Sequence, residues 1–243
     1  MEKKYKLTEE TISVDGRTLY RIEALKDFND VKKGDKGGFI EDENNLTQYG
    51  KCWVYDNATV SGYAMVHNNA TVSGNAKVSG NAIIHEDAKV YGDAKVSGNA
   101  MVFDNAEIYD NAEVYSGTMV YENAKIYGNA KVSGIAAVFG DAEVCGKAEV
   151  CDHAEIRGNA IVANDSDYIV FKNWWSSGRY FTWTKSNNMW KVGCFYGSGR
   201  QLINKAYMDS ELSGTEYERV VRYIEKDYPE IIKNQQENKK SYD

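Results

Sequence analysis

The segment Val78-Ser-Gly-Asn-Ala82-Ile83-Ile84-His-Glu-Asp-Ala88-Lys-Val90 contains the pattern that decides the fold. Every sixth residue is Val or Ile, and a small residue follows four places later. The pattern runs without a slip from Val54 to Val162, through nineteen aliphatic positions, and only Thr118 and Ser166 replace the Ala. Repetition at a fixed short period is typical of proteins built from stacked repeats.

A six-residue period suits short strands joined by turns. Six residues advance an α-helix by about 600°, so the aliphatic side chains would drift around its circumference. In a strand–turn unit, the aliphatic residue points inward and Ala fits the corner, while Gly-Asn or Asp-Asn supplies the turn. On this interpretation the Asn residues of the turns are explained by a left-handed backbone conformation and have no catalytic role. Three such sides close a coil of about eighteen residues that stacks about 4.8 Å from the next.

The residues that flank the inward positions test the number of sides, because three sides require an eighteen-residue period. One face pairs Lys or Glu mainly with Ser, as in Lys77 and Ser79, and another pairs charge with Tyr, as in Lys89 and Tyr91. The third face is apolar and aromatic, and it consists of Met65, His67, Ile83, His85, Met101, Phe103, Met119, Tyr121 and Phe139. Face identity recurs every third hexad, which predicts a three-sided parallel β-helix.

An aliphatic residue followed four places later by a small one resembles the hexapeptide-repeat, left-handed β-helix family. The left hand is implied by this resemblance, since general crossover rules favour a right-handed turn. The flanking segments Leu19-Tyr-Arg-Ile22, Gly37-Gly-Phe-Ile40 and Gly193-Cys-Phe-Tyr-Gly197 are similar to those of hexapeptide-repeat proteins from phages and prophages, whose biochemistry is unassigned.

Three regions are expected. Residues 1–53 form an N-terminal β cap with a hairpin at Asp15-Gly16 and a first, irregular coil, because Leu46 and Val54 are eight residues apart. Residues 54–167 form the β-helix. Residues 168–243 form a small aromatic-rich α+β domain with three strands, two helices that begin at capping boxes on Ser198 and Thr215, a stop at Pro229 and a frayed tail.

Composition excludes several classes of protein. The chain has 243 residues, of which 42% are hydrophobic and 27% charged, so a packed core is expected. Its longest apolar run spans 135–139, too short for a membrane helix, and the N-terminus predicts no signal peptide. Four Cys without C-x-x-C spacing indicate reduced thiols in a cytoplasm and no metal site. The net charge of −7 disfavours binding to duplex nucleic acid.

The apolar face predicts self-association. A monomer seldom exposes so long a stripe of Met, Ile and aromatic side chains. Three copies packed around a threefold axis would bury it, so we expect a homotrimer that uses this face. Cover by the cap domains of the same chain is the alternative.

The histidines raise the question of enzymatic activity. Many hexapeptide proteins are acyltransferases in which a His at the subunit interface acts as a base on an acyl acceptor. The resemblance therefore offers His67 or His85 as a catalytic base, with coenzyme A as the cofactor. The other interpretation is an interface ladder with no cofactor, favoured because residues 54–167 contain no insertion to form a substrate cleft.

The C-terminal domain is the other candidate for binding. Residues 168–243 contain 12 Lys and Arg against 9 Asp and Glu, so their net charge is +3. Basic side chains among aromatic rings form a possible site for an anionic ligand, and core packing explains the same aromatics equally well. The candidate residues are Arg179, Lys185, Arg200, Trp174, Trp175, Trp183 and Trp190.

These expectations favour a non-enzymatic, homotrimeric binding or scaffold protein. The resemblance to phage-borne proteins implies a protein of the host cytoplasm that binds or sequesters a host protein or a small, nucleotide-like anion in anti-defence. An acyltransferase that uses acyl-coenzyme A is the alternative, and a structural role in a phage particle is the third possibility.

Overall fold

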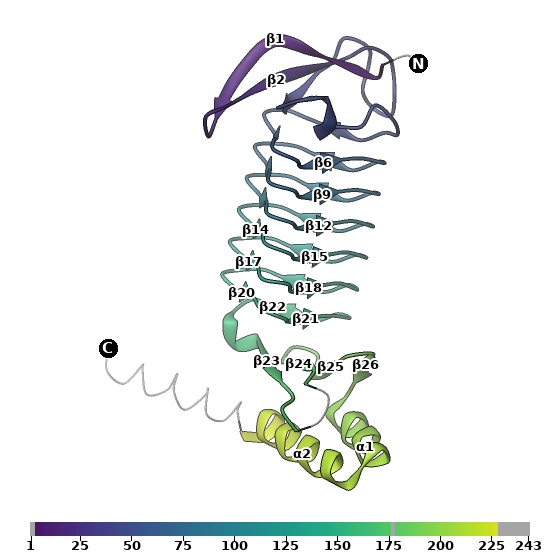
Figure 1. Ribbon diagram of the computed structural model, residues 1–243, viewed down its shortest axis with the longest axis vertical. Coiled ribbons are helices and arrows are strands. Elements are labelled where there is room, and N and C mark those ends of the chain that lie inside the picture. Colours follow the sequence, from purple (N-terminus) through teal and green to yellow (C-terminus); the bar gives the residue numbers. More distant parts are fainter. Residues whose placement is uncertain (1–2, 176–177, 228–243) are drawn as a thin grey trace, which may run out of the picture. The chain divides into compact units, whose positions relative to one another are not determined.

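The computed structural model describes residues 3–175 and 178–227 and divides the chain into two compact units, 1–167 and 168–243. The predicted fold class, a three-sided left-handed parallel β-helix with a β cap and a small α+β unit, is confirmed. Figure 1 shows the β-helix strands stacked in columns along the first unit.

Each side of the β-helix is a parallel sheet of mostly two-residue strands. We name the sides by their outward residues. The serine side continues from the cap through β3 (Lys36–Ile40), β5 (Thr59–Val60), β8 (Lys77–Val78), β11 (Lys95–Val96), β14 (Glu113–Val114), β17 (Lys131–Val132) and β20 (Glu149–Val150). The tyrosine side contains β4 (Trp53–Val54), β7 (Thr71–Val72), β10 (Lys89–Val90), β13 (Glu107–Ile108), β16 (Lys125–Ile126), β19 (Glu143–Val144) and β22 (Ile161–Val162). The apolar side contains β6 (Met65–Val66), β9 (Ile83–Ile84), β12 (Met101–Val102), β15 (Met119–Val120), β18 (Ala137–Val138) and β21 (Glu155–Ile156).

The interior contains the residues that the repeat predicts. All nineteen aliphatic positions and the corner Ala residues are fully buried, and each aliphatic side chain contributes about 1.5–3 kcal/mol by leaving water. Thr118 is buried at an Ala position because its hydroxyl donates to the carbonyl oxygen of Tyr115 at 2.8 Å. The corners of the coils therefore all accommodate a small buried side chain.

The turns differ from the sequence prediction in one respect. The left-handed residue is the first of each turn pair, such as Gly98 or Asp104, and the Asn that follows it is not left-handed. The prediction was therefore wrong for the second-position Asn residues and holds at Asn68, which is the first residue of its pair and is left-handed. Several of them instead hydrogen-bond to the equivalent residue one coil on, as Asn69 does to Asp87 at 3.0 Å and Asn123 does to Asp141 at 3.0 Å. Their amide groups link neighbouring turns.

The N-terminal cap covers the first coil. Strands β1 (Tyr5–Val14) and β2 (Arg17–Ala24) form the predicted hairpin, with left-handed Asp15 and Gly16 in its turn, and β2 pairs with β3. The segment η1 (Glu43–Asn45) then leads to Leu46, which pairs with Val66 twenty residues on. An ordinary coil has eighteen residues, so the predicted two-residue insertion in this coil is confirmed.

The second unit is an antiparallel sheet with two helices. Its strands are β23 (Tyr168–Lys172), β24 (Tyr180–Thr184), β25 (Met189–Val192) and β26 (Phe195–Gly197), preceded by η2 (Asp165–Asp167) at the end of the first unit. Helix α1 (Gly199–Asp209) begins at the predicted Ser198 capping box. Helix α2 (Glu211–Arg222) begins at Ser210, so the predicted start at Thr215 was wrong, and η3 (Tyr223–Asp227) follows it. Strand β26 was not predicted. Pro229 and the last ten residues lie outside the described residues.

In the part of the chain that the structure describes, no helix has the length and apolar character needed to cross a membrane.

Candidate functional site

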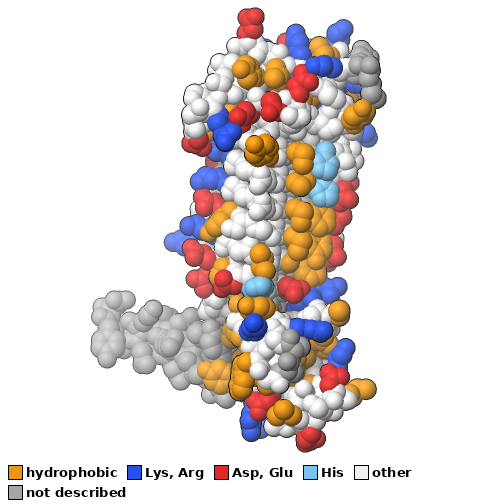
Figure 2. Space-filling model, in the orientation of Figure 1, with side chains coloured by type: hydrophobic (Ala, Val, Ile, Leu, Met, Phe, Trp, Pro, Cys, Tyr) orange, Lys and Arg blue, Asp and Glu red, His pale blue; other side chains and the backbone are white. Residues whose placement is uncertain are grey.

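The apolar side brings the predicted interface residues together in two columns. Parallel pairing places Met101 between Ile83 and Met119, so the residues before the inward position line up. We call this column the methionine row (Met65, Ile83, Met101, Met119). The residues after the inward position form the ring ladder (His67, His85, Phe103, Tyr121, Phe139). Figure 2 shows orange side chains beside and below pale blue histidine side chains on this side, with red carboxylates along one edge.

The ring ladder is a continuous stack of five rings. Neighbouring centroids lie 4.7–5.1 Å apart and neighbouring planes diverge by at most 11°. The guanidinium of Arg157 lies 5.1 Å from the centroid of Phe139 and covers the last ring. Stacking buries the faces of the rings and leaves their edges outward, so the side presents a flat surface.

The two histidines occupy the first two rungs of the ring ladder. Their rings lie 5.1 Å apart and nearly parallel, and His85 also stacks on Phe103 at 5.0 Å. Burial lowers the pKa of His85, and a second positive charge on His67 would lower it further. The neutral imidazole is therefore the favoured form of His85 in the folded protein.

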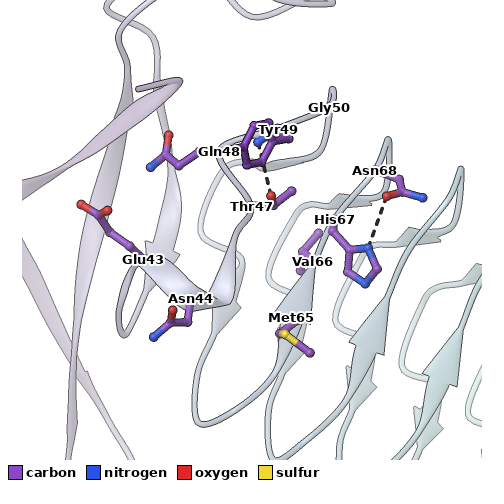
Figure 3. Close-up of a pocket in the computed structure, with 10 residues that line it drawn as sticks. All are labelled: Glu43, Asn44, Thr47, Gln48, Tyr49, Gly50, Met65, Val66, His67 and Asn68. Atoms are coloured by element: carbon purple, nitrogen blue, oxygen red, sulfur yellow. Dashed lines mark hydrogen bonds between the residues drawn. The ribbon is translucent and has the colours of Figure 1, made fainter. Parts of the chain in front are cut away.

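A pocket lies beside His67. It has a volume of about 510 Å³, and its wall is the insertion coil, Glu43 to Gly50, facing Met65, His67 and Asn68 of the apolar side. Figure 3 shows His67 turned to Asn68, whose side-chain oxygen lies 3.3 Å from His67 Nδ1. If Nδ1 donates to that oxygen, the lone pair of Nε2 stays available to accept a proton.

This pocket was not predicted, because a substrate cleft was sought in residues 54–167 alone and the insertion in the first coil was not connected with one. The insertion that forms the wall lies before them, between Leu46 and Val54. The eight-residue step was the available signal. Val66 pairs with Leu46, and residues 47–50 depart from the regular coil directly above His67. Of the two candidate bases, the pocket therefore contacts His67 and not His85.

The column of acidic residues beside the apolar side and the column of Tyr residues on the tyrosine side both have structural explanations. Along the edge of the apolar side, Glu86 Oε2 accepts from the backbone N–H of Asp104 at 2.9 Å, and Asp104 Oδ2 accepts from that of Glu122 at 3.0 Å. These carboxylates fasten one turn to the next. On the tyrosine side, Tyr91 stacks on Tyr109, and burial together with the Glu107 carboxylate raises the pKa of Tyr91 to about 12.

The seven candidate binding residues of the second unit do not form one cluster. Trp183 and Trp190 belong to the core, where their indole N–H groups donate to Asn188 and Glu225 at 2.8 Å. Trp175 packs against that core and Trp174 is 81% exposed. Arg179, Lys185 and Arg200 are exposed at three different places in the chain.

One small pocket in this unit contains Arg179. Its volume is about 100 Å³ and its apolar lining comes from β25, β26, α1 and α2, with Leu202 and Tyr217 among the buried residues. Lys205 provides a second cation at the pocket, and Asp209 and Cys194 also line it. The sequence did not predict Lys205, Cys194 or Asp209 as candidate binding residues. These residues come together only because α1 lies near the β25–β26 turn.

The close packing of Arg179 depends on a glycine. Gly193 has a left-handed backbone, and a Cβ on it would approach the Arg179 guanidinium to 2.9 Å. Among the described residues, no carboxylate forms an ion pair with Arg179 or Lys205 at the pocket. The charged side chains at this pocket are Arg179 and Lys205, with the carboxylate of Asp209 also in the lining.

Comparison with known proteins agrees with the repeat fold. A family model described as the YdcK β-solenoid repeat matches residues 54–68, from β4 to just past β6, which include His67 and Asn68. A protein of Escherichia coli (strain K12) named uncharacterized acetyltransferase YdcK is 43% identical over 72 residues. That match covers 26% of this chain and 22% of the relative, so the chain spans less than a quarter of the relative's length.

Proposed function

We propose that this protein is a non-enzymatic β-helical scaffold that assembles as a homotrimer through its apolar side and carries a small binding unit. The observation that carries the proposal is the ring ladder together with the methionine row. Met65 remains 42% exposed, and Ile83, Met101 and Met119 are each partly exposed. Apolar surfaces of this extent are usually covered by another protein surface.

A second copy of the chain is the occupant that best fits this side. The outward residues recur once per coil, so a surface with the same spacing can contact every coil in the same way. No insertion interrupts residues 54–162, and the side is therefore flat along its length. Threefold symmetry is inferred from the resemblance to hexapeptide proteins, and it closes the assembly without exposed apolar ends.

The oligomer is tested by placing charges in the centre of the apolar side. We expect wild-type protein to have three times the mass of one chain in light scattering. Met101→Glu with Phe103→Lys should give monomer, because a trimer would bury unpaired charges. The matched control is Lys77→Glu with Ser79→Lys on the serine side, which should leave the mass unchanged. A wild-type monomer, or an unchanged mass for the apolar-side variant, would contradict the proposal.

The binding role is proposed for the pocket of Arg179 and Lys205. Its volume of about 100 Å³ admits one carboxylate or phosphate group rather than a whole nucleotide. A nucleotide-like ligand or an acidic residue of a host protein could insert such a group. We also propose that the protein comes from a phage and acts in anti-defence. This part of the proposal rests on the resemblance of the flanking segments alone.

Acyl transfer is the second candidate, and the pocket beside His67 is the observation that favours it. With about 510 Å³, the pocket is large enough for a small acyl acceptor, and His67 would take a proton from its hydroxyl or amine. The name of the Escherichia coli relative points the same way.

Coenzyme A separates the two candidates. If acyl transfer is the function, coenzyme A should raise the melting temperature, acetyl-coenzyme A should be consumed, and His67→Gln should abolish consumption while binding persists. The scaffold proposal expects no coenzyme A-dependent shift. His85→Gln is the control, since His85 lies outside the pocket lining.

A further inference from the structure

Lys4 is buried in the N-terminal cap, with an exposed fraction of 1%. Its Nζ donates to the carbonyl oxygen of Cys52 at 2.9 Å and approaches the carbonyl oxygen of Tyr49 at 3.4 Å. The Cys52 Sγ lies 3.2 Å from the same nitrogen, and the ring of Phe28 lies 5.3 Å away. Cys52 is fully buried as well. An amine and a thiol, 48 residues apart in the chain, are therefore in direct contact.

The surroundings favour the neutral forms of both groups. None of the contacts given for Lys4 Nζ by the described residues is a carboxylate, and a buried ammonium without one is costly. Burial lowers the pKa of Lys4 and raises the pKa of the Cys52 thiol. A neutral amine has a free lone pair, which an ammonium lacks, so the nitrogen can form a new bond.

The burial of the Cys52 thiol also favours oxidation by a small apolar molecule. Peroxide and other polar oxidants must leave water to reach a thiol with no exposed surface. Dioxygen is small and apolar, and apolar protein interiors admit such molecules. Once the thiol is oxidised, the amine is the nearest nucleophile, because no atom lies between Nζ and Sγ at 3.2 Å.

We propose that Lys4 and Cys52 form a covalent nitrogen–oxygen–sulfur bridge when the protein is exposed to dioxygen. One N–H bond of the amine and the S–H bond of the thiol break, and new N–O and O–S bonds form around one oxygen atom. The other oxygen atom leaves as water with the two hydrogens. Nitrogen and sulfur each lose two electrons, and dioxygen accepts four.

The bridge would tie the beginning of β1 to the insertion coil. The backbone N–H of Lys4 already donates to the side chain of Gln48 at 2.8 Å, and Gln48 and Tyr49 line the pocket beside His67. A covalent link across this contact restricts the unfolded chain and raises thermal stability. The redox state of the pair would thereby set the rigidity of one pocket wall, whatever that pocket binds.

Intact-mass measurement tests the bridge. The full chain has four Cys, so replacing Cys145, Cys151 and Cys194 by Ser leaves Cys52 as the one thiol. After exposure to air we expect a gain of about 14 Da, distinct from about 16 Da for a sulfenic acid. Dithiothreitol should reverse the gain, and isotopically heavy dioxygen should increase it. Peptide mapping should find the peptides of residues 4 and 52 linked.

Lys4→Arg in the same background is the matched control, since it keeps a long basic side chain and removes the primary amine. We expect no gain of about 14 Da from this variant. Unlinked peptides after full exposure of the parent protein to air, or oxygen added to Cys52 alone, would overturn the proposal. The parent's peptide map gives this answer even if the control fails to fold.

Discussion

The imidazole of His85 lies flat on the imidazole of His67, with 5.1 Å between their centroids and 6° between their planes. Two imidazolium ions in this arrangement would repel each other in a partly buried position. The ring ladder therefore tolerates aromatic rungs and neutral histidines better than charged ones, and this preference can be measured.

Stability should fall in mild acid because of His85. Its pKa in the folded protein is lowered, whereas an unfolded His titrates near 6.5. Below about pH 6.5 the unfolded chain binds more protons than the folded chain, so stability is lost as the pH falls through this value and is constant above it. His85→Phe extends the ladder without a titratable group. Between about pH 7.5 and about pH 5.5 its melting temperature should fall less than that of the wild type. Parallel decreases for the two proteins would refute this role of His85.

Overfilling a corner should destabilise the β-helix. Ala112 is fully buried, and Ala112→Leu should cost about 1–3 kcal/mol of the free energy of unfolding because the interior has no room for it. Lys77→Leu adds the same side chain on the exposed serine side and should change stability by about 0.5 kcal/mol or less. Urea denaturation measures both. Equal losses would mean that the inward and outward assignments do not govern stability.

The pocket of Arg179 should bind a small oxyanion. We expect inorganic phosphate or acetate to perturb the NMR signals of Leu202 and Ala206, which line the pocket. Arg179→Ala should weaken binding about tenfold or more, the loss expected for one charge-assisted hydrogen bond. Lys185→Ala, outside the lining, is the control. Equal weakening by both substitutions would indicate general attraction to a basic unit and no defined pocket.

Removal of the second unit should separate assembly from binding. Residues 1–167 form a compact unit of their own. A chain ending at Asp167 should keep its β-rich circular dichroism and its oligomeric mass and should lose oxyanion binding. Oxyanion binding retained by this shortened chain would place the ligand on the β-helix.

The six-residue repeat was sufficient to predict the β-helix because its information is local. The geometry of one coil requires an inward aliphatic residue such as Val102 and a small corner residue such as Ala106. The next coil has the same geometry and therefore the same requirements. The ring ladder could be predicted for the same reason, since parallel pairing aligns every eighteenth residue.

The missed features depend on contacts between segments that follow no period. The pocket beside His67 requires the insertion coil, and the Lys4–Cys52 contact requires the hairpin to fold back over that coil. The start of α2 was misplaced because Ser210 caps it without a Glu or Gln three residues on, whereas Thr215 offers one inside the helix. The pocket of Arg179 joins strands and helices that no short motif connects.

The regular coils between the cap and β22 have the same length and the same inward pattern, so the first unit can be lengthened by whole coils. Duplicating one coil, for example residues 95–112, would lengthen the column by one strand spacing, about 4.8 Å, and leave both ends unaltered. Selection can therefore adjust the length of this unit in fixed steps, independently of the pocket at its first coil. Each added step would contribute one more rung to the surface through which copies are proposed to associate, so reach and assembly strength would change together.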